Sequence, residues 1–306
     1  MPSRFSGHES FACRYAWLPK ALQAIHSDSR IFADEEKAMV KLGVGKNMVR
    51  SIRFWVEATG MAQPAVGGGL EPTALGRWIF GPKGLDPYLE DIQTLWLIHW
   101  NLSTHVVDPL FAWDFLINRW QEPELTESAI LKAFAREAAA QERKKTLSPV
   151  TLQQHFQVFL HTYIPTRGRK AEIAEDNLDC PLNELDLLVK IGERETDAGH
   201  FSREDVYVFR REDKPGISAA LFSYCLDDYW EKTYPNEKTL SVRSIATGVA
   251  SPGQVFKIPE DDIYTRLSDL REATGGVLCY QESTALQQAH RSDAVDRKRL
   301  LAQAYQ

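Results

Sequence analysis

Residues 34–58 read Asp34-Glu-Glu-Lys-Ala-Met-Val-Lys-Leu42, Gly43-Val-Gly45 and Lys46-Asn-Met-Val-Arg-Ser-Ile-Arg-Phe-Trp-Val-Glu-Ala58. Asp34 is a favourable N-cap for a helix that ends at the glycine-containing turn. In the second segment Val49, Ile52 and Val56 recur every three or four residues, which predicts one apolar helix face. The stretch therefore predicts two helices joined by a tight turn, the helix-turn-helix pattern.

The residues that follow extend this pattern into a hairpin. The loop Ala65-Val-Gly-Gly-Gly69 separates Met61-Ala-Gln-Pro64 from Leu70-Glu-Pro-Thr73. Three consecutive glycines suit a hairpin tip, where positive φ angles are needed. A helix-turn-helix followed by a hairpin is the winged-helix arrangement, so residues 1–85 are predicted to form an N-terminal winged-helix DNA-binding domain.

The remaining chain predicts two further regions. Residues 86–165 are rich in Leu, Trp and strong helix formers and predict a helical domain, a central bundle. Residues 166–306 predict a mixed domain, with a strand at 206–210, a buried helix at 217–230 and a helix at 259–273. That last helix and an expected hairpin at 277–286 form a second winged-helix-like unit. The predicted fold class is mainly α with short β-hairpins (α+β).

The net charge of the chain hides a strongly uneven distribution. The 306 residues hold 36 Lys and Arg against 42 Asp and Glu, a net charge of −6, which argues weakly against a surface coated in nucleic acid. Residues 41–55 nevertheless carry +4, residues 141–170 carry +5 and residues 171–213 carry −8. Phosphate binding depends on where the basic residues lie, so local DNA contact is compatible with the total.

The cysteine spacing, the N-terminal sequence and the apolar runs indicate the cellular compartment of the protein. The four cysteines form no CxxC pair, which argues against a zinc ribbon and favours buried thiols in a reducing compartment. The N-terminus lacks the basic and apolar runs of a secretory signal, and the apolar run Thr94-Leu-Trp-Leu-Ile-His-Trp100 is too short to span a membrane. We expect a cytoplasmic protein with no membrane partner.

Two basic groups are candidate DNA contacts. Arg and Lys pair with guanine or phosphate and Asn pairs with adenine, so the second predicted helix offers Lys46, Asn47, Arg50 and Arg53. The alternatives are a solvated helix face or a protein-docking unit. A second group would bind phosphates by charge, or would only make a solubilising loop. It comprises Arg143, Lys144, Lys145, Arg167, Arg169 and Lys170.

Two acidic groups are candidate catalytic residues. Asp176, Asp179 and Glu184 belong to a dense carboxylate stretch, and Mg²⁺ or another divalent metal prefers such oxygen ligands. A capped helix start or an electrostatic interface also explains the stretch. His8 and Glu9 form an acid–base pair beside Gly7, although a histidine near a terminus is often structural. The sequence has no P-loop, GxSxG or HExxH motif. No organic cofactor is expected.

Several segments together resemble the SspB-type DNA nickase family of bacterial single-strand DNA phosphorothioation (Ssp) systems, which is catalogued as a domain of unknown function. The segments are Phe5-Ser-Gly-His-Glu-Ser-Phe11, Leu42-Gly-Val-Gly-Lys-Asn-Met-Val-Arg-Ser-Ile-Arg53, Leu75-Gly-Arg-Trp-Ile-Phe80, Asp86-Pro-Tyr-Leu-Glu-Asp91, Glu175-Asp-Asn-Leu-Asp-Cys-Pro-Leu-Asn-Glu-Leu185 and Ser251-Pro-Gly-Gln-Val-Phe-Lys257. The resemblance runs over nearly the whole chain.

The resemblance implies that one DNA strand is nicked so that sulfur can replace a non-bridging phosphate oxygen, in anti-phage defence. It implies a cysteine desulfurase, an ATP-pyrophosphatase-type sulfur transferase and an ATPase as system partners. It assigns no catalytic residues, which rest on the candidates above. The alternatives are a winged-helix DNA-binding or scaffold protein without chemistry of its own, and a transcriptional regulator.

Overall fold

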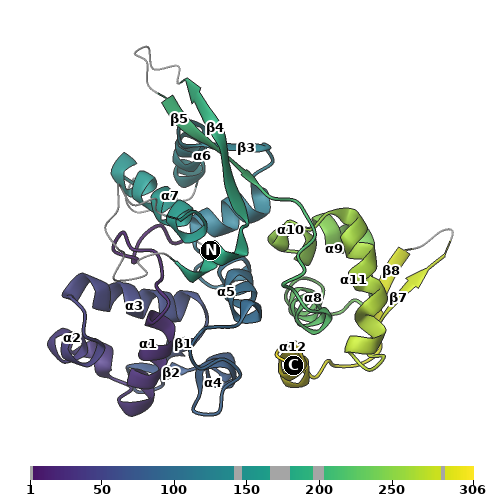
Figure 1. The fold of residues 1–306 in the computed structure, drawn as a ribbon, viewed down its shortest axis with the longest axis horizontal. Helices are drawn as coiled ribbons and strands as arrows, with labels where there is room; N and C mark the ends of the chain where they lie inside the picture. The colour runs from purple at the N-terminus through teal and green to yellow at the C-terminus, as the bar shows by residue number, and fades with distance from the viewer. Residues whose placement is uncertain (1–2, 141–146, 166–179, 196–202, 284–286) are drawn as a thin grey trace.

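The protein is described by a computed structural model over residues 3–140, 147–165, 180–195, 203–283 and 287–306. The described part is mainly helical, with three small antiparallel sheets, in agreement with the predicted class. In Figure 1 the N-terminal and central regions stack on the left, and the C-terminal region lies to the right, reached by the chain that leaves the central sheet.

The N-terminal region contains the predicted pair of helices. Asp34 caps the first helix by accepting a hydrogen bond from the Lys37 N–H, and Gly43 ends it in a left-handed conformation. Val49, Ile52 and Val56 are at most 2% exposed, so the predicted apolar face is confirmed. The region comprises α1 (Trp17–Ser27), the 3₁₀ helix η1 (Ile31–Ala33), α2 (Glu35–Leu42), α3 (Lys46–Ala58), β1 (Ala62–Pro64), β2 (Leu70–Pro72) and α4 (Ala74–Phe80).

The glycine loop makes the predicted hairpin. β1 pairs with β2 in antiparallel register, and Gly67, Gly68 and Gly69 all have positive φ. Glycine is required at position 69 for two reasons. Its φ is positive, and a Cβ there would lie 2.3 Å from the Ser29 carbonyl oxygen. Arg30 donates to the Gly67 carbonyl over 2.8 Å and ties the loop to the end of α1.

The central region is helical as predicted but also contains a sheet. Its strand order is β3-β5-β4, and β3 pairs with β5 across about 80 residues of sequence. This pairing joins the predicted regions 86–165 and 166–306. The elements are α5 (Ile92–Thr104), the π-helix η2 (Trp113–Arg119), β3 (Glu124–Thr126), α6 (Glu127–Ala140), α7 (Pro149–Tyr163), the 3₁₀ helix η3 (Pro181–Leu185), β4 (Leu188–Glu195) and β5 (Arg203–Phe209).

The C-terminal region repeats the arrangement of the central one. Its strand order is β6-β8-β7, so again the second hairpin strand lies in the middle and a short strand precedes two or more helices. The predicted helices at 217–230 and 259–273 are confirmed, and the predicted hairpin lies a few residues later. The elements are α8 (Ala219–Thr233), β6 (Thr239–Ser241), α9 (Val242–Thr247), α10 (Pro252–Phe256), α11 (Glu260–Ala273), β7 (Leu278–Glu282), β8 (Gln287–Arg291) and α12 (Arg297–Ala304).

One aromatic core connects the first two regions. Trp55 on α3 meets Trp113 on η2 edge to face at 5.9 Å between ring centroids, and Trp113 meets Phe159 on α7 at 5.3 Å. Edge-to-face pairs of this kind stabilise a core beyond the area they bury. The core therefore fixes α3 relative to α7, although the helices are about a hundred residues apart in sequence.

A buried hydrogen-bond chain joins the central and C-terminal regions. The Trp113 indole N–H donates to the Tyr163 hydroxyl over 2.9 Å, and that hydroxyl lies 2.7 Å from Nδ1 of His99. Nε2 of His99 contacts the Val255 carbonyl at 3.0 Å. Because a carbonyl only accepts, His99 carries its proton on Nε2 and accepts from Tyr163 on Nδ1. Every side-chain polar group in this hydrogen-bond chain therefore has a partner.

Within the described ranges, every helix is too short or too polar to cross a lipid bilayer.

Candidate nucleic-acid interface

α3 presents the predicted DNA-contacting residues on one exposed face. Lys46, Asn47, Arg50 and Arg53 are all exposed and recur at helical spacing. The opposite side of the helix is buried, with Phe54 and Trp55 in the core, so these side chains cannot turn inward. The core fixes the helix, and the spacing therefore directs all four polar side chains to solvent together.

Two carboxylates neutralise most of this face. Glu35, in the first turn of α2, lies 2.7 Å from both Lys46 and Arg50, and Glu57 lies 3.0 Å from Arg53. The hydrogen bonds from Lys46 and Arg50 hold the pKa of Glu35 below its usual range, and Glu35 raises the pKa of Arg50. The +4 counted over residues 41–55 misses both acids, because Glu35 and Glu57 lie outside that window in sequence and beside it in space.

His8 lies in the core rather than at the surface. The residue is 3% exposed, and its ring meets Phe54 edge to face at 5.6 Å and stacks on His155 of α7 at 5.4 Å. The Ser51 hydroxyl donates to the His8 carbonyl over 3.0 Å. A phosphate cannot approach a ring in this position, which favours a structural role for His8. Glu9, by contrast, is exposed, because the chain turns through positive φ at Glu9 and Ser10.

His8 and His155 form a buried pair of neutral rings. The Ala112 N–H donates to Nε2 of His155 over 2.9 Å, so Nδ1 of His155 carries the ring proton. Nδ1 of His155 lies 3.1 Å from Nε2 of His8, and Nδ1 of His8 accepts from the Ser10 N–H over 3.3 Å. Burial lowers the pKa of His8 to about 4, assisted by the positive charge of Arg4, and burial lowers the pKa of His155 well below its usual value. Both rings are thus neutral at pH 7 and bind the N-terminal segment to α7.

The predicted carboxylate cluster is described only in part. Glu184 lies at the surface of η3 and accepts a hydrogen bond from the Tyr15 hydroxyl. Asp176 and Asp179 lie outside the described residues. So does the second basic group, which comprises Arg143, Lys144, Lys145, Arg167, Arg169 and Lys170. Among the described residues, no three His, Cys, Asp or Glu side chains gather as a metal site.

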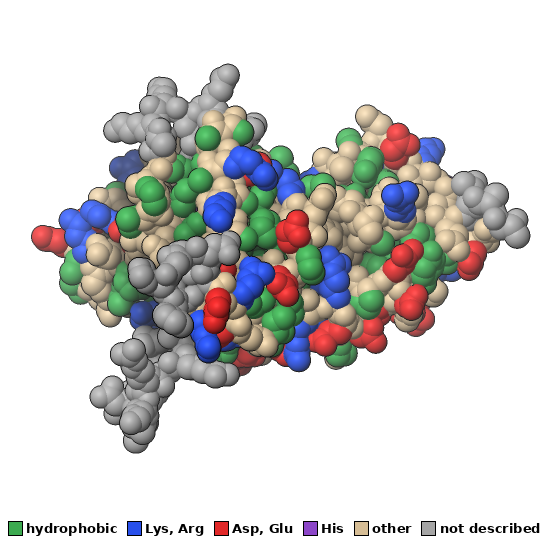
Figure 2. All heavy atoms as spheres, turned by 90° about the horizontal axis from the view of Figure 1, so that it is seen from above, with side chains coloured by type: hydrophobic (Ala, Val, Ile, Leu, Met, Phe, Trp, Pro, Cys, Tyr) green, Lys and Arg blue, Asp and Glu red, His purple; other side chains and the backbone are tan. Residues whose placement is uncertain are grey.

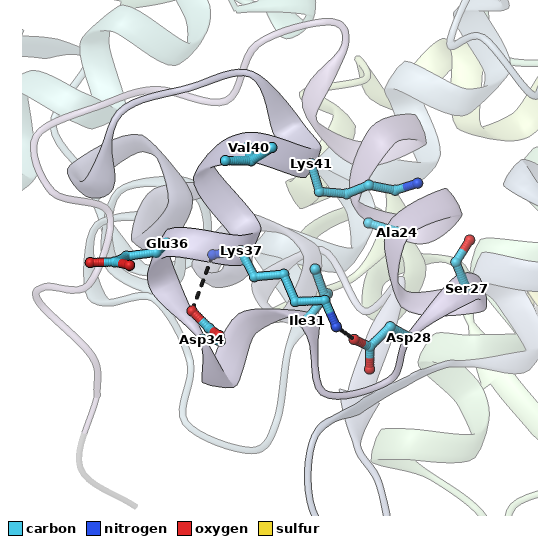
Figure 3. Close-up of a pocket in the computed structure, with 9 residues that line it drawn as sticks. All are labelled: Ala24, Ser27, Asp28, Ile31, Asp34, Glu36, Lys37, Val40 and Lys41. Carbon is cyan, nitrogen blue, oxygen red and sulfur yellow. Dashed lines mark hydrogen bonds and ion pairs between the residues drawn. The ribbon is translucent and has the colours of Figure 1, made fainter.

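A surface groove of about 650 Å³ adjoins α2 without involving the predicted DNA contacts. Figure 3 shows Lys37 reaching across it to Asp28, at 2.5 Å, while its backbone N–H bonds to Asp34. This ion pair lowers the pKa of Asp28. Lys46, Arg50 and Arg53 do not line the groove, so it is separate from the cationic face of α3. Its lining residues are Ala24, Ser27, Asp28, Ile31, Asp34, Glu36, Lys37, Val40 and Lys41.

Charge is divided over the surface. In Figure 2 carboxylates gather along the lower right edge, over the C-terminal region, whereas Lys and Arg side chains are spread over the left and centre. The sequence of α11 contributes to this acidic region, since it has five acidic and two basic residues between positions 260 and 273. The cationic face of α3 lies away from this acidic region in the chain.

Comparisons with known proteins agree with the predicted family. A magnesium ion-bound SspB crystal structure is similar over 99% of this chain and 90% of that one, with 26% identity and a TM-score of 0.83. A second SspB crystal structure has 25% identity and a TM-score of 0.82, over 99% of this chain and 87% of that one. No curated protein matches the chain. Residues 5–305 match the family described as protein of unknown function DUF4007, and the chain belongs to this family.

Proposed function

We propose that this protein binds duplex DNA and nicks one strand within an Ssp-type phosphorothioation system that defends against phage. The observation that carries the proposal is the similarity to SspB structures over 99% of the chain. The exposed residues Lys46, Asn47, Arg50 and Arg53 add an independent chemical argument, since they offer both phosphate and base contacts on one helix.

In this proposal α2, α3 and the hairpin β1–β2 act as a winged helix. α3 would lie in the major groove, and the glycine-rich hairpin tip would reach the adjacent backbone. Glu35 and Glu57 would exchange their cationic partners for DNA phosphates. Such an exchange is feasible because these ion pairs are exposed to solvent and therefore weak.

Strand cleavage would require water to attack a backbone phosphorus atom while one ester oxygen leaves. A bound divalent cation would stabilise the charge that develops on phosphate. We propose Asp176, Asp179 and Glu184 as its ligands and Glu9 as a further acidic group close to α3. Because His8 is buried, we assign it a positioning role for the segment that carries Glu9. The proposed system partners are a cysteine desulfurase, an ATP-pyrophosphatase-type sulfur transferase and an ATPase.

Relaxation of a supercoiled plasmid tests the nicking step. The purified chain should convert supercoiled DNA into open circles in the presence of Mg²⁺, and chelation of the metal should stop the reaction. The D176N/D179N/E184Q variant should retain DNA binding and lose nicking. Supercoiled DNA that persists with several divalent metals would contradict the nickase.

The second candidate is a winged-helix DNA-binding or scaffold protein with no chemistry of its own. The buried position of His8 favours it, since that position removes one predicted general base from the surface. Plasmid nicking that survives in D176N/D179N/E184Q would identify a contaminating nuclease and support this reading. A transcriptional regulator would instead show strong preference for one operator in the same binding assay.

A further inference from the structure

The central region has the element order of a second winged helix. β3 is followed by the helices α6 and α7 and then by the hairpin β4–β5, with β5 in the middle of the sheet. The C-terminal region repeats this order with β6, α9 to α11 and β7–β8. In the N-terminal region α3 is the last helix before its hairpin. α11 holds the same position in the C-terminal region, and α7 is the last α-helix described before β4, with the short 3₁₀ helix η3 between them. In DNA-binding proteins of this kind, the last helix before the hairpin enters the major groove.

The three equivalent helices differ in what they expose. α3 presents cations and α11 presents carboxylates, whereas α7 contains no Asp, Glu, Lys or Arg among its fifteen residues. Its exposed side is a single stripe, with Val150, Gln153, Gln154 and His161 exposed and Gln157 half-buried. The spacing of three and four places these side chains on one face. A helix face that serves only for solubility is usually charged, and this one is not.

Most of the polar side chains on this stripe lack a hydrogen-bond partner within the part of the chain that the structure describes. Gln154, Gln157 and His161 make no side-chain hydrogen bond to another described residue, while Gln153 donates to Glu127 over 2.7 Å. A glutamine amide presents a donor and an acceptor side by side. This pair matches N7 and N6 of adenine at the edge of the major groove.

The surroundings of the stripe also suit DNA. A groove of about 440 Å³ separates α7 from the hairpin β4–β5, and Gln157, His161, Lys190 and Tyr207 are among its lining residues. The two carboxylates of this groove are both paired. Asp205 lies 2.6 Å from Lys190, and Asp186 pairs with Arg210. The stripe itself carries no carboxylate, and the Glu127 carboxylate beside it accepts a hydrogen bond from Gln153.

We infer that α7 is a base-reading helix, with Gln154 and Gln157 as its principal sequence-determining residues and duplex DNA as its ligand. The inference rests on the proposed DNA binding and adds to it a division of labour. The cations of α3 supply affinity through phosphates, and the amides of α7 supply sequence preference through base edges.

Selection from a random duplex pool tests this division. The full chain is incubated with the pool, and the bound fraction is sequenced. Affinity is then measured for the enriched duplex and for a shuffled duplex of equal composition. The Q154A/Q157A variant should reduce the affinity ratio between these duplexes by about tenfold or more, while binding to the shuffled duplex changes by less than about twofold. R50A/R53A should weaken binding to both duplexes alike.

Gln23→Ala provides the matched control, since Gln23 is an exposed helical glutamine on α1. It should leave both affinities unchanged, and thermal melting should show that all variants are folded. An unchanged ratio in Q154A/Q157A would overturn the inference. So would a pool that yields no enriched sequence while R50A/R53A still weakens binding, a result that leaves the proposed DNA binding intact. A chain that binds no duplex at all overturns the proposed function as well.

Discussion

At the scale of single residues, Glu35 regulates the charge of the candidate interface. It begins α2, where a carboxylate is favourable near the positive helix end, and it also accepts from Lys46 and Arg50 of α3. The helical spacing of the cations predicts their shared face but does not predict their partner Glu35. Glu35 is separated from Arg50 by fifteen positions, and only the turn at Gly43–Gly45 brings the two helices together. The charge of a surface is thus set by the fold and cannot be read from a sequence window.

Neutralising this partner should strengthen DNA binding. Glu35→Gln keeps the shape of the side chain but removes its charge, so Lys46 and Arg50 no longer have an anionic competitor for phosphate. We expect affinity for duplex DNA to rise by about threefold at low salt and the gain to shrink as salt screens the charges. Fluorescence anisotropy titrations at two salt concentrations measure this gain in affinity and its dependence on salt. Unchanged or weaker binding would show that the α3 face does not contact DNA.

Removing the cations should have the opposite effect. R50A/R53A should weaken binding and reduce the slope of log affinity against log salt by about 2, since each phosphate contact contributes about 0.9 to that slope. The matched control is R271A/K298A, which removes two exposed cations from the C-terminal region and gives the same net charge. Equal slopes for the two double variants would exclude a specific role for α3.

At the scale of elements, the sequence predicts those with strong local signals. The helices α2, α3, α8 and α11 have caps, periodicity or acidic first turns, and all four form where predicted. β3 and β6 were missed because three residues are too few to show alternation, and their partners lie far along the chain. The π-helix η2 lies in a run of large apolar residues that shows no distinct period, so only its burial was predictable.

Two glycines of the hairpin β1–β2 separate the effect of a positive φ from the effect of a close contact. Gly67 and Gly69 both have positive φ, but a Cβ on Gly67 meets open space and one on Gly69 meets the Ser29 carbonyl. We expect Gly67→Ala to cost about 1 kcal/mol for backbone strain. Gly69→Ala should cost at least about 1 kcal/mol more, because the backbone must move.

Urea unfolding of the two glycine variants measures this difference. Equal midpoints would show that the hairpin tip is not held against Ser29. A larger loss for Gly67→Ala would show that φ strain outweighs the close contact. DNA affinity measured on the same samples would report whether the hairpin tip also contributes to binding.

At the scale of the whole molecule, buried neutral histidines hold the regions together. His8 and His155 connect the N-terminal segment to α7, and His99 connects α5 to the C-terminal region through Val255. Lys257 also connects the central and C-terminal regions, because its buried side chain donates to the Ile117 carbonyl of η2. Burial lowers the pKa of Lys257 to about 7. None of these contacts was predictable from the sequence, because each joins residues more than a hundred positions apart.

This architecture predicts loss of stability in mild acid. The pKa of His99 is lowered by burial from 6.5 to about 4, so between these values the unfolded chain binds a proton that the folded chain does not. Stability therefore falls as pH drops from 6.5 towards 4, by up to about 1.4 kcal/mol per pH unit for each such histidine. For His99 the total is about 3 kcal/mol. Protonation of Nδ1 would also remove the acceptor that Tyr163 needs.

Urea unfolding at pH 7.5, 6.0 and 5.0 measures this dependence. His99→Gln keeps a donor and an acceptor but cannot titrate, so its stability should depend less on pH than that of the unsubstituted chain, by up to about 1.4 kcal/mol per unit. His26→Gln, at an exposed position on α1, should leave the dependence unchanged. If His99→Gln has the same slope as the unsubstituted chain, then the ring is protonated in the folded state. The hydrogen bonds from Tyr163 to His99 and from His99 to Val255 would then not be those of a neutral ring, and a neutral ring would not hold the C-terminal region in place.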